Sequence, residues 1–320
     1  MVRTSATSAT SGDTLPVALQ SLHLTAVHMS TLVTIDLLTA GNPTEARQSV
    51  ERALAWFGRV EQACSRFDSA SELRRLSATD RTPVPVGPIL FEALRFALSL
   101  ARATGGAFDP TVGATMQAKG FATHYVTGES APAIPTRRPA TYRDVRIDTS
   151  KRTVTLRTPM LLDLGAVAKG LALDLAAAEL TTYPGFCIEA GGDVRVKGHN
   201  ASGRPWHIGV QHPLHPGALI RTLEVVSGAV CTSGDYEHRT PDGAEHHLID
   251  PRTGHSAAAL TSVTVLAPTA LAADGLATAA FILGPEHGRR LLESQGVTGI
   301  LVTPAGQVLE TLRRGASQRP

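Results

Sequence analysis

Asp274 and Thr278 are the two residues whose types and spacing most directly indicate chemistry. They lie four positions apart in segment 269–283, whose apolar pattern predicts a helix, so both side chains project from one helix face about a turn apart. A carboxylate and a hydroxyl are hard oxygen ligands, and Mg²⁺ often takes only one or two protein ligands while phosphate oxygens and water complete its shell. The alternative is a solvated Asp274 beside a Thr278 that donates to its own helix backbone.

Two glycine-containing segments have the character of phosphate-binding turns. Segment 163–170 (DLGAVAKG) leads into a predicted helix over 166–182, where small residues let backbone N–H groups approach a phosphate and Lys169 adds a positive charge. Gly191 and Gly192 follow a predicted strand at 186–190 and either bring the main chain close to a ligand or form a bulge. Each segment alone is equally compatible with a turn that needs glycine only for its backbone geometry.

Two further segments supply hydroxyls and a histidine. Thr232 and Ser233, followed by Gly-Asp-Tyr, suit the surroundings of a phosphate or an aromatic ring, but they are equally typical of a polar turn. A strand over 247–249 is expected to place His247 and Ile249 on one face and Leu248 on the other. His247 there could deprotonate a hydroxyl, although a single strand histidine is more often structural.

Composition excludes several classes of protein. With 42% hydrophobic and 18% charged residues, the chain can bury a substantial core. Its 30 Lys and Arg residues are spread evenly among 28 Asp and Glu, which predicts neither a nucleic-acid partner nor a polybasic membrane anchor. The P-loop, Rossmann, zincin and α/β-hydrolase motifs do not occur in the sequence.

The cysteines and the first residues bear on the compartment. Cys64, Cys187 and Cys231 are widely spaced in apolar or strand-like surroundings, which favours buried free thiols. Residues 1–13 lack an apolar run, so neither a signal peptide nor an integral membrane segment is encoded, and a cytoplasmic location is expected. A mature exported form would give the same pattern.

The expected elements describe one domain over 23–312, between a disordered Ser/Thr-rich tail at 1–22 and a flexible tail at 313–320. A first strand is expected at 31–36, long helices from Pro43 and over 88–104, a loop at 106–113 and a surface excursion at 120–141. Short strands are expected at 145–147, 154–156, 186–190, 194–197, 207–211, 222–226, 247–249 and 263–266, with helices at 166–182, 269–283 and 286–294. This order favours an α+β fold, a single domain on a largely antiparallel sheet with inserted helices.

The motifs, taken in order, resemble those of the FAD:protein FMN transferase family, the ApbE-like flavin transferases. The resemblance covers residues 27–285, and its blocks are 65–68 (SRFD) with 71–73 (SEL), 106–113 (GAFDPTVG), 163–170 (DLGAVAKG), 190–193 (AGGD), 232–236 (TSGDY), 247–254 (HLIDPRTG) and 273–279 (ADGLATA). It implies an ApbE-like, T-fold-like α+β domain that uses Mg²⁺ to move the FMN half of FAD onto a threonine hydroxyl of an acceptor flavoprotein, with release of AMP.

The resemblance also implies roles for individual residues. Asp274, Thr278 and the backbone carbonyl of Ala166 correspond to the magnesium ligands, and Asp274 and His247 to the catalytic pair. The positions that line the FAD site correspond to Asp109, Gly165, Lys169, Gly191, Gly192, Thr232, Ser233 and His247.

One departure from the family pattern concerns the balance between two reactions. Many relatives carry asparagine where this chain has Ser77, near the expected mouth of the flavin site, and this leaves open whether FAD is transferred to protein or hydrolysed. The alternatives are therefore a Mg-dependent FAD pyrophosphatase, or a FAD-binding protein without turnover.

Overall fold

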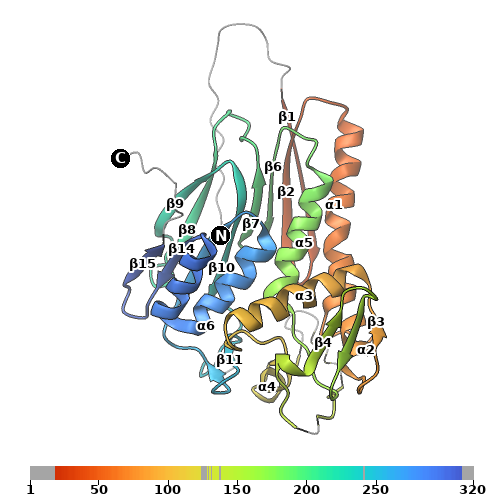
Figure 1. Ribbon diagram of the computed structural model, residues 1–320. Helices are drawn as coiled ribbons and strands as arrows, with labels where there is room; N and C mark the ends of the chain where they lie inside the picture. Colours follow the sequence, from red (N-terminus) through yellow and green to blue (C-terminus); the bar gives the residue numbers. More distant parts are fainter. Residues whose placement is uncertain are drawn as a thin grey trace, which may run out of the picture.

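An eight-stranded antiparallel sheet forms the centre of the molecule in the computed structural model, which describes residues 19–123, 128, 130, 132–136, 138–240 and 242–311 (Figure 1). Its strands, in spatial order, are β1 (Gln20–His28), β2 (Thr31–Thr39), β6 (Gly185–Ala190), β7 (Asp193–Lys197), β10 (Ser227–Gly234), β13 (Ser262–Ala267), β14 (Thr298–Val302) and β15 (Val308–Thr311). The expected tails at 1–18 and 313–320 lie outside the described residues, whereas 20–22 belong to β1.

Period-two alternation explains which face of the sheet is buried. Val33, Ile35 and Leu37 of β2 are completely buried against the helices, while Leu32, just before them, is 58% exposed on the other face. One strand was expected here, but residues 20–39 form a hairpin whose turn residues Met29 and Ser30 both have positive φ angles, 48° and 61°. β1 was missed because it is an edge strand with only half-buried apolar positions.

Three long helices cover one face of the sheet and fill the main core, α1 (Pro43–Cys64), α5 (Gly165–Glu179) and α6 (Ala270–Gln295) (Figure 1). α1 begins as expected, because the side chain of Asn42 accepts a hydrogen bond from Thr44 N at 2.8 Å and Pro43 occupies the first turn. α6 is broken at Gly284, where φ is 78°, just before Pro285. This break separates the two helices expected at 269–283 and 286–294.

A two-stranded ribbon lies over part of the other face. It consists of β8 (Trp206–Gln211) and β9 (Leu219–Val225). Trp206, Ile208 and Val225 of the ribbon pack on Val194, Val196 and Val230 of the main sheet in a second, smaller core. The opposite faces of β7 and β10 are thus both covered.

A third group of elements follows α1 along the chain and projects from the end of the helical layer (Figure 1). It contains α2 (Glu72–Ser77), α3 (Pro88–Ala103), α4 (Gly113–Ala118), the 3₁₀ turn η1 (Tyr142–Asp144) and a small sheet in the order β3 (Val84–Pro85), β5 (Thr153–Leu156), β4 (Val145–Asp148). The expected excursion at 120–141 contains no helix or strand in its described residues.

Several local expectations were wrong. Residues 232–234 belong to β10 and do not form a polar turn, because their backbone pairs with β13 while their small side chains face the helices or the cavity described below. The strand expected at 247–249 is reduced to β11 (Ile249–Asp250), which pairs only with β12 (His255–Ser256). α4, β14 and β15 were not expected.

The fold class and the cysteine assignment agree with expectation. The structure is a mixed α+β domain with a largely antiparallel sheet, and all three cysteines are buried and free. None of the described helices is both long and apolar enough to cross a bilayer.

Candidate active site

A cavity of about 860 Å³ lies between the helical layer, the main sheet and the loops around α4. All residues that the sequence indicated as site candidates line it: Asp109, Gly165, Ala166, Lys169, Gly191, Gly192, Thr232, Ser233, His247, Asp274 and Thr278. They come from six motifs spread between residues 109 and 278, so the fold brings dispersed segments of the chain together into one site.

Asp274 is fixed by an unusually close contact between α5 and α6. Gly170 N donates to Asp274 Oδ2 at 3.0 Å, and a Cβ on Gly170 would lie only 2.4 Å from the carbonyl oxygen of Ala270. Only glycine permits this approach. Because the N–H of residue 170 in an α-helix points toward the carbonyl of residue 166, Asp274 lies beside the Ala166 carbonyl.

Thr278 follows Asp274 by one turn of α6, as expected, and it does not point to solvent. Its Oγ1 lies 3.0 Å from Ser233 Oγ of β10, and both side chains are buried at the cavity wall. The helix and the strand therefore present a carboxylate, two hydroxyls and a backbone carbonyl to one region.

Lys169 and Asp193 form an ion pair across the cavity wall. Lys169 Nζ of α5 lies 2.7 Å from Asp193 Oδ2 at the start of β7, and Asp193 Oδ1 accepts a hydrogen bond from Thr232 N at 3.0 Å. Burial disfavours the lysine charge, but Asp193 and Asp274 outweigh it and raise the pKa of Lys169. Lys169 therefore stays protonated inside the cavity.

Asp193 and Asp274 are two carboxylates close to one lysine, Lys169. The negative charge of Asp274 is therefore only partly compensated. Burial and then the charge of Asp193 raise the pKa of Asp274 to about 8, although Lys169 and the N–H of Gly170 lower it. A further cation beside Asp274 would relieve this. The all-oxygen donor set of Asp274, Thr278 and the Ala166 carbonyl suits a hard divalent cation such as Mg²⁺.

His247 extends into the cavity from an irregular segment, and the strand geometry expected for it was wrong. Its Nδ1 lies 3.1 Å from the carbonyl oxygen of Glu237, to which it donates, so Nε2 retains its lone pair. Its backbone N–H donates to the carbonyl of His238 at 3.2 Å, and it lies outside any strand because β11 begins only at Ile249. Burial, and then the neighbouring His238, lower the pKa of His247 to about 3.

The paired glycines form a tight hairpin turn, and the bulge alternative does not apply. Gly191 and Gly192 connect β6 to β7 with φ angles of 57° and 89°, which match the turn type that favours glycine. This turn brings Asp193 back toward Lys169.

Asp109 lines the cavity but is engaged within its own loop. Its Oδ1 accepts hydrogen bonds from Thr111 N and Oγ1, and its Oδ2 accepts one from Tyr142 N at 3.0 Å. Burial raises the pKa of Asp109 despite these bonds. Asp109 therefore shapes the cavity wall by holding residues 109–112 and η1 together.

Sequence reasoning assigned no role to Arg66, Asp163 and Asp193, although all three stand in its motifs. Arg66 Nε lies 2.5 Å from Asp163 Oδ2, and Asp163 Oδ1 accepts from Gly165 N at 2.8 Å. Arg66 Nη1 also donates to the carbonyl of Phe121 at 2.7 Å. The sequence shows a basic residue in the SRFD block and an acidic residue in the DLG block, which are able to pair. Only the fold shows that the two blocks are in contact.

Ser77 does not lie at the cavity. It is 0% exposed at the end of α2, where its Oγ accepts a hydrogen bond from Leu162 N at 3.4 Å. Ser77 is therefore not part of the described cavity lining, because α2 turns its side chain toward the core.

A buried carboxylate, hydroxyls, a charged lysine and a half-buried neutral histidine around one cavity define an enzyme that handles an anionic substrate. Comparison with known proteins is consistent with this class. The ApbE family model matches residues 29–301. The chain therefore belongs to the ApbE family.

Individual relatives support the same placement. The FAD:protein FMN transferase of Haemophilus influenzae is 31% identical over 265 residues, which cover 76% of this chain and 75% of the relative. The crystal structure of the ApbE protein of Thermotoga maritima superposes with a TM-score of 0.80 at 30% identity, covering 91% of this chain and 97% of that one. The flavin transferase ApbE of Vibrio cholerae gives a TM-score of 0.77 at 28% identity, with 92% and 97% covered. The family and the enzyme class expected from the sequence, a transferase, are confirmed.

Proposed function

We propose that this protein transfers FMN from FAD to a threonine hydroxyl of an acceptor flavoprotein, in a Mg²⁺-dependent reaction that releases AMP. The observation that supports it most strongly is the convergence of Lys169, Asp274, Thr278 and His247 on one cavity. Relatives that carry the name FAD:protein FMN transferase give the reaction class.

The chain's own residues suit the binding of a dinucleotide diphosphate. Lys169 supplies a retained positive charge, and Gly165 begins α5, whose N-terminus carries partial positive charge, at the cavity wall. Thr232 and Ser233 add hydroxyl groups from the facing strand. The diphosphate would thus lie between α5 and β10.

Asp274, Thr278 and the carbonyl of Ala166 are the residues that would hold Mg²⁺. A divalent cation bound there neutralises diphosphate charge and polarises the phosphoryl oxygens. The chain's contribution is the positioning of these oxygens, which depends on the Gly170 contact between α5 and α6.

His247 is placed to accept the proton of the acceptor's threonine hydroxyl. The threonine Oγ forms a bond to the FMN phosphorus, the bond from that phosphorus to the bridging oxygen breaks, and AMP leaves with the bridging oxygen. The hydroxyl proton passes to Nε2 of His247, which is unprotonated because Nδ1 is the donor to Glu237. The proton then leaves to solvent.

The test combines the protein with FAD, Mg²⁺ and a threonine-bearing flavoprotein encoded near it, with chelator as the control. Flavinylated acceptor plus AMP, seen by mass spectrometry and chromatography, supports the proposal. FMN plus AMP without acceptor labelling identifies a pyrophosphatase that uses water in place of threonine. Intact FAD in every mixture identifies a binding protein and refutes catalysis.

A further inference from the structure

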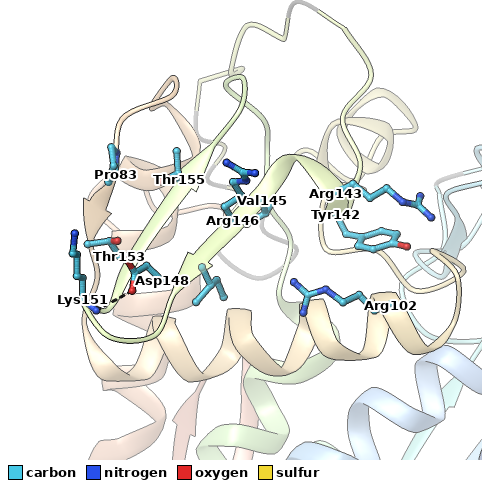
Figure 2. A pocket seen from close by; sticks show the side chains of 11 residues that line it. Pro83, Arg102, Tyr142, Arg143, Val145, Arg146, Asp148, Lys151, Thr153 and Thr155 are labelled. Atoms are coloured by element: carbon cyan, nitrogen blue, oxygen red, sulfur yellow. Dashed lines mark hydrogen bonds between the residues drawn. The ribbon is translucent and has the colours of Figure 1, made fainter.

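A second concave surface lies apart from the catalytic cavity, along strand β4. It has a volume of about 620 Å³, and its lining includes Arg102 at the end of α3, Arg143 of η1, Arg146 of β4 and Lys151 of the β4–β5 turn. We call this surface the β4 groove. Figure 2 shows Arg102, Tyr142 and Arg143 at one end of the strand and Lys151 and Thr153 at the other, so the cations are distributed along an elongated surface.

The charge of the β4 groove is locally unbalanced. Among the described residues Asp148 is the only carboxylate in its lining, and Asp148 Oδ1 already accepts hydrogen bonds from Ser150 N, Ser150 Oγ and Lys151 N. Within the described part of the chain, Arg102, Arg146 and Lys151 form no ion pair, and all three side chains are exposed. Basic residues are therefore not spread evenly, as the sequence suggested, but gather here on a chain whose net charge is only +2.

β4 also presents a free backbone edge. The small sheet has the order β3, β5, β4, so in the described residues β4 pairs on one side only, with β5. A strand edge of this kind can receive an extended segment through main-chain hydrogen bonds. Ile147, which is half-buried, adds apolar surface in the same groove.

We propose that the β4 groove binds an extended acidic segment of the acceptor protein, a proposal that rests on the function proposed above. A protein acceptor must be held by more than its reacting hydroxyl, and complementary charge both steers its encounter and fixes its orientation. The groove adjoins the cavity wall, because Tyr142 lines the groove and its N–H donates to Asp109 Oδ2 in the cavity.

A protein segment fits this groove better than a single-stranded nucleic acid. Base stacking needs an accessible aromatic face. Tyr142 is the only aromatic side chain in the groove lining that the structure describes; it is buried, and the guanidinium of Arg143 lies 4.6 Å from its ring centroid. A strand edge, in contrast, is specific to polypeptide partners.

The test uses fluorescent peptides of about twelve residues that are rich in Asp, Glu and Val, with Asn/Gln versions as neutral controls. Anisotropy measures their binding to the parent, to Arg102→Glu/Arg146→Glu, and to the equal charge change Arg47→Glu/Arg290→Glu outside the groove. We expect the groove variant alone to weaken acidic-peptide binding by roughly tenfold or more, and added salt to weaken it in the parent. Equal binding by the groove variant and the outside variant overturns the proposal. Tighter binding of an oligothymidylate than of the acidic peptide overturns the class of partner.

Kinetics with the flavoprotein acceptor separate this proposal from the proposed function. The groove variant is expected to raise the acceptor KM by about tenfold while kcat and the Kd for FAD remain at parent values. An unchanged KM in an active transferase refutes the groove assignment alone. Absence of transfer in the parent refutes the proposed function, whereas the peptide measurement still tests the groove.

Discussion

Lys169 Nζ lies 2.7 Å from Asp193 Oδ2, and this contact joins helix α5 to the β6–β7 hairpin within the cavity. Asp193 is only 1% exposed, so its charge depends on Lys169 for compensation. The pair therefore has two separable roles, one in stability and one in providing positive charge for a substrate diphosphate.

Replacing Lys169 with Met should reveal both roles. Because a buried Asp193 is left without its partner, we expect the free energy of unfolding to fall by roughly 2–4 kcal/mol and FAD affinity to fall by about tenfold or more. Lys169→Met/Asp193→Asn keeps an acceptor for Thr232 N, so it should recover most of the stability but not the affinity. Urea unfolding and calorimetric titration with FAD measure the two effects; full recovery of affinity in the double variant would show that Lys169 does not bind the diphosphate.

The α5–α6 contact should not tolerate a side chain at residue 170. In Gly170→Ala the new Cβ would lie 2.4 Å from the Ala270 carbonyl oxygen and 2.9 Å from Asp274 Cβ, so the helices must separate. We expect a loss of about 1–3 kcal/mol in stability and a large loss of FAD cleavage. Gly58→Ala in α1 is the matched control, because its nearest neighbour atom is 3.9 Å away and alanine favours the helix. Thermal unfolding compares them, and equal behaviour of the two variants would contradict the packing argument.

If Asp274 and Thr278 bind Mg²⁺, substitutions at these two positions should differ in how much FAD cleavage they retain. Thr278→Val keeps the shape but removes the hydroxyl, and Asp274→Asn removes the charge, so both should lose Mg²⁺-dependent FAD cleavage by about a hundredfold or more. Thr278→Ser should retain most activity. Addition of Mg²⁺ should raise the melting temperature of the parent and of the serine variant only; an equal rise in Asp274→Asn would exclude Asp274 as a ligand.

His247 should stay neutral in the free protein over the whole range where ordinary histidines titrate. Its pKa is lowered to about 3, while an unfolded histidine has a value near about 6.5. The unfolded state therefore binds the extra proton between these values, so the contribution of His247 to stability is complete above pH ~6.5 and declines as pH falls. Imidazole NMR should show no His247 titration between about pH 5 and 8, and His247→Gln should make the acid limb of the stability curve shallower. A midpoint near neutrality would refute the burial argument.

Local sequence patterns predicted the long helices, and together with the family resemblance they predicted residues that line the cavity. Asn42 and Pro43 specify the start of α1, and the spacing of Asp274 and Thr278 specifies one face of α6. These two features can be read from the residues of each helix alone, without knowing which other element the helix packs against.

The features that were missed depend on long-range packing. β10 was not among the expected strands, because Thr232, Ser233 and Gly234 have small polar side chains that are equally typical of a turn and suit a strand here because a cavity lies over them. The burial of Ser77 and the ion pair of Arg66 with Asp163 depend on how residues 66–77 pack on residues 160–163, a long-range contact that no local pattern encodes.

The hairpin of β4 and β5 has a consequence for how members of one family can diverge. β4, β5 and the turn between them fall between Val145 and Leu156, a continuous stretch that includes none of the described residues that line the cavity. Grafting this stretch from a relative should therefore exchange client preference while the dinucleotide chemistry stays as it was. Sequence changes confined to this one stretch can thus alter which acceptor protein the enzyme modifies.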